Sequence, residues 1–300
     1  MSHLRAHQQV TEADLIHFIQ DEGFEVKMAT KLFNISRSTF YDVIHREPSN
    51  RAIESQRISE AIEMIYHQSD GIYGAPKIQF LLGRDYQLNI GLKRVQRLMK
   101  QLGLHSIVTK KYRPQTNHQP VEDRFNILQQ DFFANGPNQK WVADITYIPT
   151  VKDGWTYLAS VMDLFSRKII GYAYSQKMDT DLVITALGNA ALNRRPVDQG
   201  VIIHTDLGAQ YTSTDFELSI HQMGMYHSYS RKGTPYDNAG IESFHSIIKK
   251  EEVYVTTYQN FEQARVRLFQ YIEGWYNRKR IHSSLHYLTP VEFENKFSMS

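Results

Sequence analysis

The stretch Trp-Val-Ala-Asp-Ile-Thr-Tyr-Ile (141–148) places one acid, Asp144, inside an apolar run that is typical of a buried strand. Asp206 ends a second apolar run, and Glu242 opens a helical stretch further along the chain. A carboxylate in or beside a buried strand is costly unless a partner compensates its charge. A hard divalent cation is one such partner, and magnesium is usually bound by only one or two carboxylates.

Each acid alone also has an ordinary structural explanation. Asp206 precedes Leu207 and Gly208, as in a turn at the end of a strand. Glu242 suits the positive end of a helix dipole, and Asp144 fits a buried, hydrogen-bonded acid. Together, however, three carboxylates can hold two metal ions about 4 Å apart, an arrangement that serves phosphoryl transfer. The residues around the acids must decide between these interpretations.

Length and composition limit the class of protein. Three hundred residues indicate two or three domains. The net charge is only +2, from 34 basic and 32 acidic residues, so any basic surface must be local. The chain has no cysteine, which excludes disulfides and thiolate zinc sites. Neither a transmembrane-length apolar run nor a signal peptide is recognisable, so we expect a cytoplasmic protein.

The N-terminal third is predicted to be helical. Residues 27–44 indicate two short helices, with a turn at Asn34-Ile35 and a second helix capped by Ser36. A DNA-binding helix-turn-helix and an ordinary helical hairpin fit this spacing equally well. In the DNA-binding interpretation, the first turns of the recognition helix present Arg37, Ser38, Thr39 and Tyr41.

A second helical region follows. Residues 52–67 and 91–102 have helical periodicity, and Pro76 is placed to begin a helix between them. The polar face of the last helix is basic, and it carries Lys93, Arg94 and Arg97. A solvated face explains these residues, but a second helix-turn-helix-like unit in tandem favours contact with phosphates. Residues 109–121 contain two prolines and no apolar periodicity, which predicts a linker.

After residue 136 the pattern changes to strands. Three strands separated by short turns are followed by alternating helices and strands, which indicates a mixed sheet flanked by helices. Strands are expected at 140–149, 155–163, 168–175, 201–206 and 225–229, and helices at 181–193 and 213–223. The carboxyl ends of parallel strands are where such folds place their sites.

This order of elements and acids resembles the ribonuclease-H-like core of integrases and DDE transposases. Thirty-five residues separate Asp206 from Glu242, a spacing typical of retroviral integrases and of the IS-three family of bacterial insertion-sequence transposases. The amino-acid sequence of the chain is similar to the sequences of that family over nearly its whole length. The matching stretches are 73–78, 139–150, 157–172, 204–213, 230–244, 276–285 and 288–293.

The resemblance implies a fold and a domain order. We expect an α/β ribonuclease-H-like catalytic core with a mixed five-stranded sheet, preceded by all-α helix-turn-helix domains. The expected segments are a DNA-binding helix-turn-helix, a second helical domain, a linker, and the catalytic core with a helical tail, at 1–50, 51–108, 109–135 and 136–300.

The resemblance also implies the reaction. Asp144 would bridge two magnesium ions, for which manganese substitutes, while Asp206 and Glu242 each complete one metal site. Water or a 3′-hydroxyl then attacks a phosphodiester in line, which gives strand cleavage and strand transfer at the ends of the element. Phosphate contacts are expected from the basic residue Lys249, from a loop with Arg231 and Lys232, and from the run Arg278, Lys279 and Arg280.

The implied partners are double-stranded DNA, both the terminal inverted repeats and the target, and further copies of the chain on that DNA. Members of the family are often made as two overlapping reading frames, and this chain resembles the second product. It would then act with the first product or be fused to it, in association with the bacterial nucleoid. No membrane partner is expected.

Two residues depart from the family pattern. Leu207 stands where Arg is common, and His286 stands where Gly is usual. Neither is an expected metal ligand, although Leu207 removes any DNA contact that the arginine would make. Two other functions remain open at this stage: a non-catalytic DNA-binding regulator of the element, and a ribonuclease-H-like nuclease.

Overall fold

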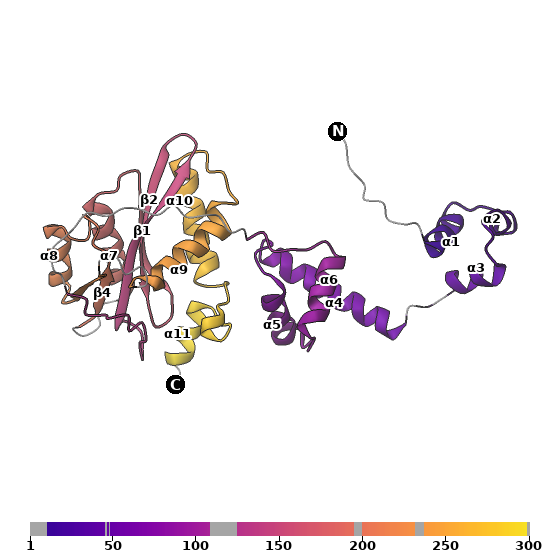
Figure 1. Ribbon diagram of the computed structural model, residues 1–300, viewed down its shortest axis with the longest axis horizontal. Coiled ribbons are helices and arrows are strands. Elements are labelled where there is room, and N and C mark those ends of the chain that lie inside the picture. Colours follow the sequence, from indigo (N-terminus) through magenta and orange to yellow (C-terminus); the bar gives the residue numbers. More distant parts are fainter. Residues whose placement is uncertain are drawn as a thin grey trace. The chain divides into compact units, whose positions relative to one another are not determined.

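The computed structural model describes residues 11–45, 47, 49–108, 125–194, 200–231 and 237–298 (Figure 1). Residues 109–124 of the expected linker lie outside this part of the chain, as does Lys232. The chain divides into two compact units, Met1–Glu63 and Met64–Ser300.

The first unit contains three short helices around a small apolar core. They are α1 (Glu12–Asp21), α2 (Val26–Leu32) and α3 (Arg37–Ile44). Asn34 takes a positive φ of 56° in the turn before α3, and the Ser36 hydroxyl accepts a 3.0 Å hydrogen bond from the Thr39 amide. The predicted turn and N-cap are therefore confirmed. The core consists of Ile16, Ile19, Ala29, Ile35 and Phe40.

The predicted helices of the next region are also present. They are α4 (Asn50–Gln68), α5 (Ala75–Tyr86) and α6 (Leu92–Gln101). Pro76 lies in the first turn of α5, where its missing amide proton costs nothing. Just before α5, the Tyr73 hydroxyl accepts a hydrogen bond from the Ile281 amide at 3.0 Å and lies 3.1 Å from the Lys279 carbonyl oxygen. This region is thereby anchored to the C-terminal part of the second unit.

The catalytic-core prediction of a mixed five-stranded sheet is confirmed. The strand order is β3-β2-β1-β4-β5, with β1 antiparallel to β2 and parallel to β4. The strands β2 and β3 are antiparallel, and β4 and β5 are parallel. The strands are β1 (Lys140–Thr150), β2 (Gly154–Asp163), β3 (Ile169–Ser175), β4 (Ile202–Thr205) and β5 (Tyr226–Tyr229).

Helices cover both faces of this sheet (Figure 1). Trp141 and Ala143 of β1 pack in one apolar cluster with α7 (Thr180–Arg194) and α8 (Thr214–Gln222). Val142 packs in the other cluster, with α9 (Ala239–Ile248) and α10 (Phe261–Phe269). Successive side chains of a strand point to opposite faces, so Asp144 shares the α9 face with Val142.

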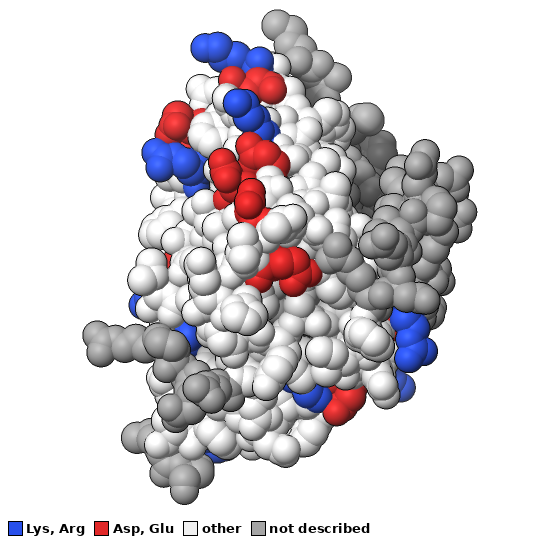
Figure 2. Space-filling model, turned by 90° about the vertical axis from the view of Figure 1, so that its left-hand side faces the viewer, with Lys and Arg blue, Asp and Glu red and all other residues white. Residues whose placement is uncertain are grey.

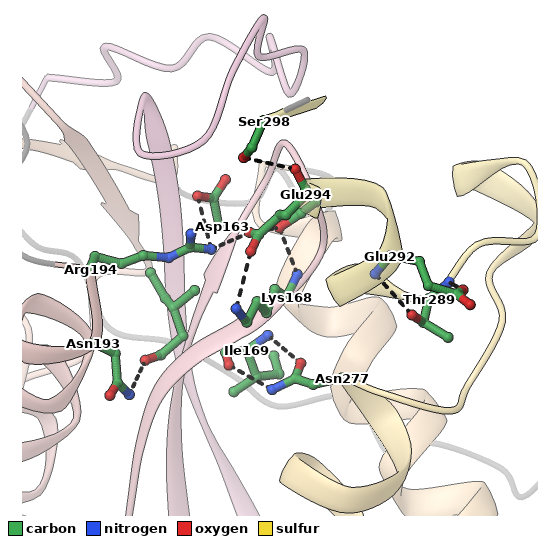
Figure 3. Close-up of polar contacts among 12 residues, drawn as sticks. Asp163, Lys168, Ile169, Asn193, Arg194, Asn277, Thr289, Glu292, Glu294 and Ser298 are labelled. Carbon is green, nitrogen blue, oxygen red and sulfur yellow. Dashed lines mark hydrogen bonds and ion pairs between the residues drawn. The ribbon is translucent and has the colours of Figure 1, made fainter. Parts of the chain in front are cut away.

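The C-terminal segment contains two π-helical turns, a short 3₁₀ turn and a final helix. These are η1 (Lys249–Val253), η2 (Gln270–Tyr276), η3 (Ser283–Leu285) and α11 (Pro290–Ser298). Figure 3 shows how α11 is fixed to the sheet: Glu294 pairs with Lys168 and with Arg194, which also lies 3.5 Å from the buried Asp163. The Asn277 side chain bonds both the amide and the carbonyl of Ile169, at 3.0 and 2.9 Å.

The buried His282 makes the folded protein sensitive to acid. Burial lowers the pKa of His282 from 6.5 to about 2, and the neighbouring Arg280 charge acts in the same direction. The unfolded chain takes up a proton below pH 6.5 and the folded chain does not, so this histidine lowers stability as the pH falls.

Between pH 7 and pH 5 we expect His282 to reduce the free energy of unfolding by about 2 kcal/mol. Urea titrations at both pH values should show this loss in the wild type. Over the same pH interval, the free energy of unfolding of a His282→Asn variant should fall by about 2 kcal/mol less than that of the wild type. An equal loss in both proteins would assign the acid sensitivity to other groups.

Candidate active site

The first two acids lie side by side at the end of the parallel strands. The parallel pairing of β1 and β4 extends to Val142 opposite His204. Continued by two residues, this register would set Asp144, within β1, opposite Asp206, just beyond the last residue of β4. Neighbouring strands are about 4.8 Å apart, so we expect the two acids to lie near each other at the carboxyl end of β4. This is the edge where open α/β sheets bind their ligands.

The helix that carries the third acid is attached to the same strand. Asn238, just before α9, donates from its side-chain nitrogen to the Ala143 carbonyl at 3.2 Å. His245, one turn after Glu242, places Nδ1 3.3 Å from Oδ2 of Asp144. These two contacts hold the first turns of α9, which carry Glu242, against β1. All three acids are partly exposed.

Backbone amides hold one oxygen of each aspartate. Asp144 Oδ1 accepts a hydrogen bond from the Ile145 amide at 2.8 Å, and Asp206 Oδ1 accepts one from the Gly208 amide at 2.9 Å. A Cβ atom on Gly208 would lie only 2.9 Å from Asp206 Oδ1, so a side chain there would displace the carboxylate. The turn expected after Asp206 is thus present, and it orients the carboxylate.

Tyr211 belongs to this site, although sequence reasoning missed it. Its side chain is buried, and its hydroxyl has no hydrogen-bond partner among the described residues. Burial raises the pKa of Tyr211 well above its usual value, and the negative charges of Asp144 and Asp206 raise it further. The phenol is therefore close enough to both aspartates to be influenced by their charges. In the sequence, its position five residues after Asp206 could have indicated that it belongs to the site.

The donor set fits hard divalent cations. Asp144, Asp206 and Glu242 offer only carboxylate oxygens, which magnesium and manganese accept. In the described parts of the chain, no group of three or more His, Cys, Asp or Glu side chains converges on one point.

The expected basic residues have different surroundings. Lys249 begins η1 with helical backbone angles, seven residues after Glu242, and so remains on the Glu242 side of the helix. Arg231, Arg278 and Lys279 are exposed. Arg280 is a correction: its guanidinium is buried and donates to both carboxylate oxygens of Glu251 at 2.8 to 3.0 Å. A buried, paired arginine cannot reach a DNA phosphate.

The candidate DNA-contacting helices present most of their expected side chains to solvent. Arg37, Ser38 and Tyr41 of α3 are exposed, whereas Thr39 is partly buried. The hydroxyls of Ser38 and Thr39 each lie 2.8 Å from the Ser36 hydroxyl, so they take part in capping α3. On α6, Lys93 and Arg97 are exposed and Arg94 is partly buried.

The face of the molecule on the α8 side is mostly uncharged. Figure 2 shows acidic side chains gathered in its upper half, with only scattered basic ones. Among the described residues, this face offers few cations to DNA phosphates. No helix in the described part of the chain combines the length and apolar character needed to cross a membrane.

Comparison with known proteins agrees with this arrangement. The family model described as "HTH-like domain" matches residues 54–112. Two models described as "Integrase core domain" match residues 134–235 and 223–290. Among solved structures, the HTLV-2 integrase catalytic core domain is 17% identical, with a TM-score of 0.42 over 54% of this chain and 99% of that one.

The curated relatives are closer. The chain is 39% identical to the transposase for insertion sequence element IS904 of Lactococcus lactis, over 84% of this chain and 98% of that protein. It is 37% identical to transposase InsF for insertion sequence IS3A of Escherichia coli, over 91% and 95% of the two chains. The strand order, the helix-turn-helix-like region and these relatives agree, and the chain belongs to the IS3-family transposases, enzymes with an integrase-type DDE core.

Proposed function

We propose that Asp144, Asp206 and Glu242 hold two magnesium ions, and that this site cleaves and joins DNA strands at the ends of an insertion sequence. The observation that carries the proposal is the parallel register of β1 and β4, which ends at Val142 opposite His204 and continues toward Asp144 and Asp206. The attachment of the Glu242 helix to Asp144 supports it. Divalent cations in such a site activate the attacking oxygen and stabilise the leaving oxygen.

The residues then have separate roles. Asp144 would be a ligand to both cations, whereas Asp206 and Glu242 would each be a ligand to one. Lys249 binds a phosphate beside the cleaved bond, as do Arg231 and Lys232, which precede α9 in the sequence. Arg278 and Lys279 contact the DNA backbone further away.

The chemistry needs no covalent protein–DNA intermediate. In cleavage, a water oxygen bonds to the phosphorus and the 3′-oxygen of the strand leaves as a hydroxyl. In joining, that hydroxyl attacks a second phosphodiester and displaces its 3′-oxygen. One phosphodiester replaces another in this second step, so the reaction requires no nucleotide cofactor.

The helical regions are proposed to bind the DNA. Residues 1–50 read the terminal repeats through Arg37, Ser38, Thr39 and Tyr41, which lie in the first half of α3. Residues 51–108 add phosphate contacts from Lys93, Arg94 and Arg97. The chain acts on bacterial nucleoid DNA as an oligomer, with the product of the first reading frame or fused to it.

A strand-cleavage assay tests this function. End-labelled duplexes that carry the ends of the element are incubated with the protein and magnesium or manganese. Cleaved and joined strands should form with either metal, and chelator or scrambled ends should abolish them.

The assay also separates the two other functions. Specific binding without cleavage in either metal would identify a non-catalytic regulator. Cleavage of the RNA strand of a hybrid, without joining of DNA ends, would identify a ribonuclease-H-like nuclease.

A further inference from the structure

Helix α9 has polar contacts with β1 on both sides of Glu242. Four residues before this acid, Asn238 donates to the Ala143 carbonyl oxygen at 3.2 Å. Three residues after it, His245 Nδ1 lies 3.3 Å from Asp144 Oδ2. The two acceptors are consecutive residues of β1. The turn of helix that carries Glu242 is thus fixed to the strand that carries Asp144.

Between these two contacts α9 packs closely against its neighbours. A Cβ atom on Gly240 would meet the end of the Leu164 side chain at 2.8 Å and Val142 Cγ2 of β1 at 3.6 Å. The two flanking polar contacts restrict the position of the helix along the strand.

The surroundings of His245 show which of its atoms matters. The side chain is buried, and Nε2 has no hydrogen-bond partner in the described part of the chain. A buried polar atom without a partner is unfavourable, so an apolar side chain would suit the packing better. The Asp144 carboxylate can only accept, so Nδ1 is the donor. The contact with Asp144 is therefore what this histidine provides.

Asp144 is held through both of its oxygens. Oδ1 accepts from the Ile145 amide at 2.8 Å, and Oδ2 lies 3.3 Å from His245 Nδ1, within reach of a donated proton. Each carboxylate oxygen has two lone pairs, so one donor on each oxygen leaves the others available to cations. With two donors the carboxylate cannot rotate freely, and its metal-binding lone pairs keep one direction.

We propose that His245 is a positioning residue for Asp144, and that with Asn238 it sets the spacing at which Asp144 and Glu242 share one divalent cation. This inference rests on the proposed metal site. Removing a hydrogen-bond partner of a metal ligand lowers metal affinity or activity by about 10- to 100-fold. A contact that only supports the fold would change thermal stability and leave metal affinity unaltered.

The test uses the full chain, manganese as the probe, and a matched pair of variants. His245→Leu removes the donor and keeps a buried side chain of similar size. His245→Asn keeps a side-chain nitrogen at the position of Nδ1. Manganese affinity is measured by calorimetry, and melting temperature is measured in chelator and at increasing manganese concentration.

We expect the leucine variant to bind manganese about 10- to 100-fold more weakly, and the asparagine variant to stay within about 3-fold of wild type. The manganese concentration for half-maximal strand cleavage should shift in parallel. If the leucine variant binds manganese as tightly as wild type and differs only in melting temperature in chelator, the inference is wrong. If the leucine variant does not fold, a His245→Gln variant is compared with the asparagine variant instead. The amide nitrogen of glutamine lies one bond further from the backbone than that of asparagine. Equal affinity of the glutamine and asparagine variants would then overturn the inference.

A third variant separates this inference from the proposed function. Asp144→Asn should lose manganese-dependent stabilisation. Unchanged manganese binding in that variant would remove the proposed metal site itself. Loss of binding in Asp144→Asn, together with wild-type binding in His245→Leu, would overturn only the role of His245.

Discussion

Each of the substitutions Asp144→Asn, Asp206→Asn and Glu242→Gln is expected to reduce strand cleavage and joining by about 10³-fold or more. An amide keeps the size of the acid and removes the charge that holds a cation. Without the cation, the transition state loses several kcal/mol of stabilisation. Each tenfold change in rate corresponds to about 1.4 kcal/mol, which gives the expected magnitude. Single-turnover rates on end-labelled duplexes in magnesium measure the effect.

The same substitutions should leave DNA binding within about 3-fold of wild type, because the proposed binding residues lie mainly on α3 and α6. Glu262→Gln is a suitable control, since this acid is exposed and pairs with Arg265, three residues further along the same helix. Turnover near the wild-type rate in any one of the three variants would remove that residue from the site. Loss of DNA binding together with a lower melting temperature would instead indicate damage to the fold.

Local patterns predicted the elements of this fold but not how the acids meet. The strand expected at 140–149 is observed at Lys140–Thr150, because apolar alternation within one segment is a property of that segment. The parallel register of β1 and β4, which continues toward Asp144 and Asp206, joins segments about sixty residues apart. Neither periodicity nor turn residues determine such a pairing. Before the structure, only the family resemblance placed these acids together.

Arg280 and His286 show two further limits of the sequence. In the run Arg278, Lys279, Arg280 the three side chains are chemically alike, and only the tertiary contact with Glu251 decides that one of them is buried. His286 replaces a glycine that is usual in the family, and its backbone has a φ of +54°. The left-handed conformation explains why glycine suits this position, and a histidine there bears a cost of about 1 kcal/mol.

The second large effect is expected from the buried pair of Arg280 and Glu251. Arg280→Met should lower the free energy of unfolding by about 3–5 kcal/mol, because it leaves an uncompensated carboxylate in the protein interior. Burial by itself would raise the pKa of Glu251, but the charge and hydrogen bonds of Arg280, with smaller contributions from Lys77 and Tyr271, together outweigh it, and the pKa lies below its usual value. The pair therefore stabilises the folded protein at neutral pH, and this stabilisation is lost as the pH falls through the lowered pKa of Glu251.

The carboxylate depends on Arg280 more than on its other neighbours. The Tyr271 hydroxyl donates to Glu251 Oε2 at 2.8 Å, and the Trp275 ring nitrogen lies 3.4 Å from the same oxygen. These donors are neutral, so they satisfy lone pairs without cancelling the charge. Thermal melts should show a decrease of about 10 °C in Arg280→Met, at about 2–4 °C for each kcal/mol in a unit of this size.

Arg265→Met is the matched control, since the same substitution there breaks a pair with Glu262 in which the side chains are 60% and 65% exposed. Exposed pairs contribute about 0–1 kcal/mol, so this variant should melt within about 3 °C of wild type.

The double variant Glu251→Leu, Arg280→Met removes both charges and should recover most of the lost stability, because apolar replacements of a buried pair are often neutral. If Arg280→Met melts like the control, Glu251 must find another cation or take up a proton, and the pair does not hold the C-terminal helices to the catalytic core. If the double variant melts as low as Arg280→Met, the loss comes from packing around the guanidinium and not from an uncompensated charge.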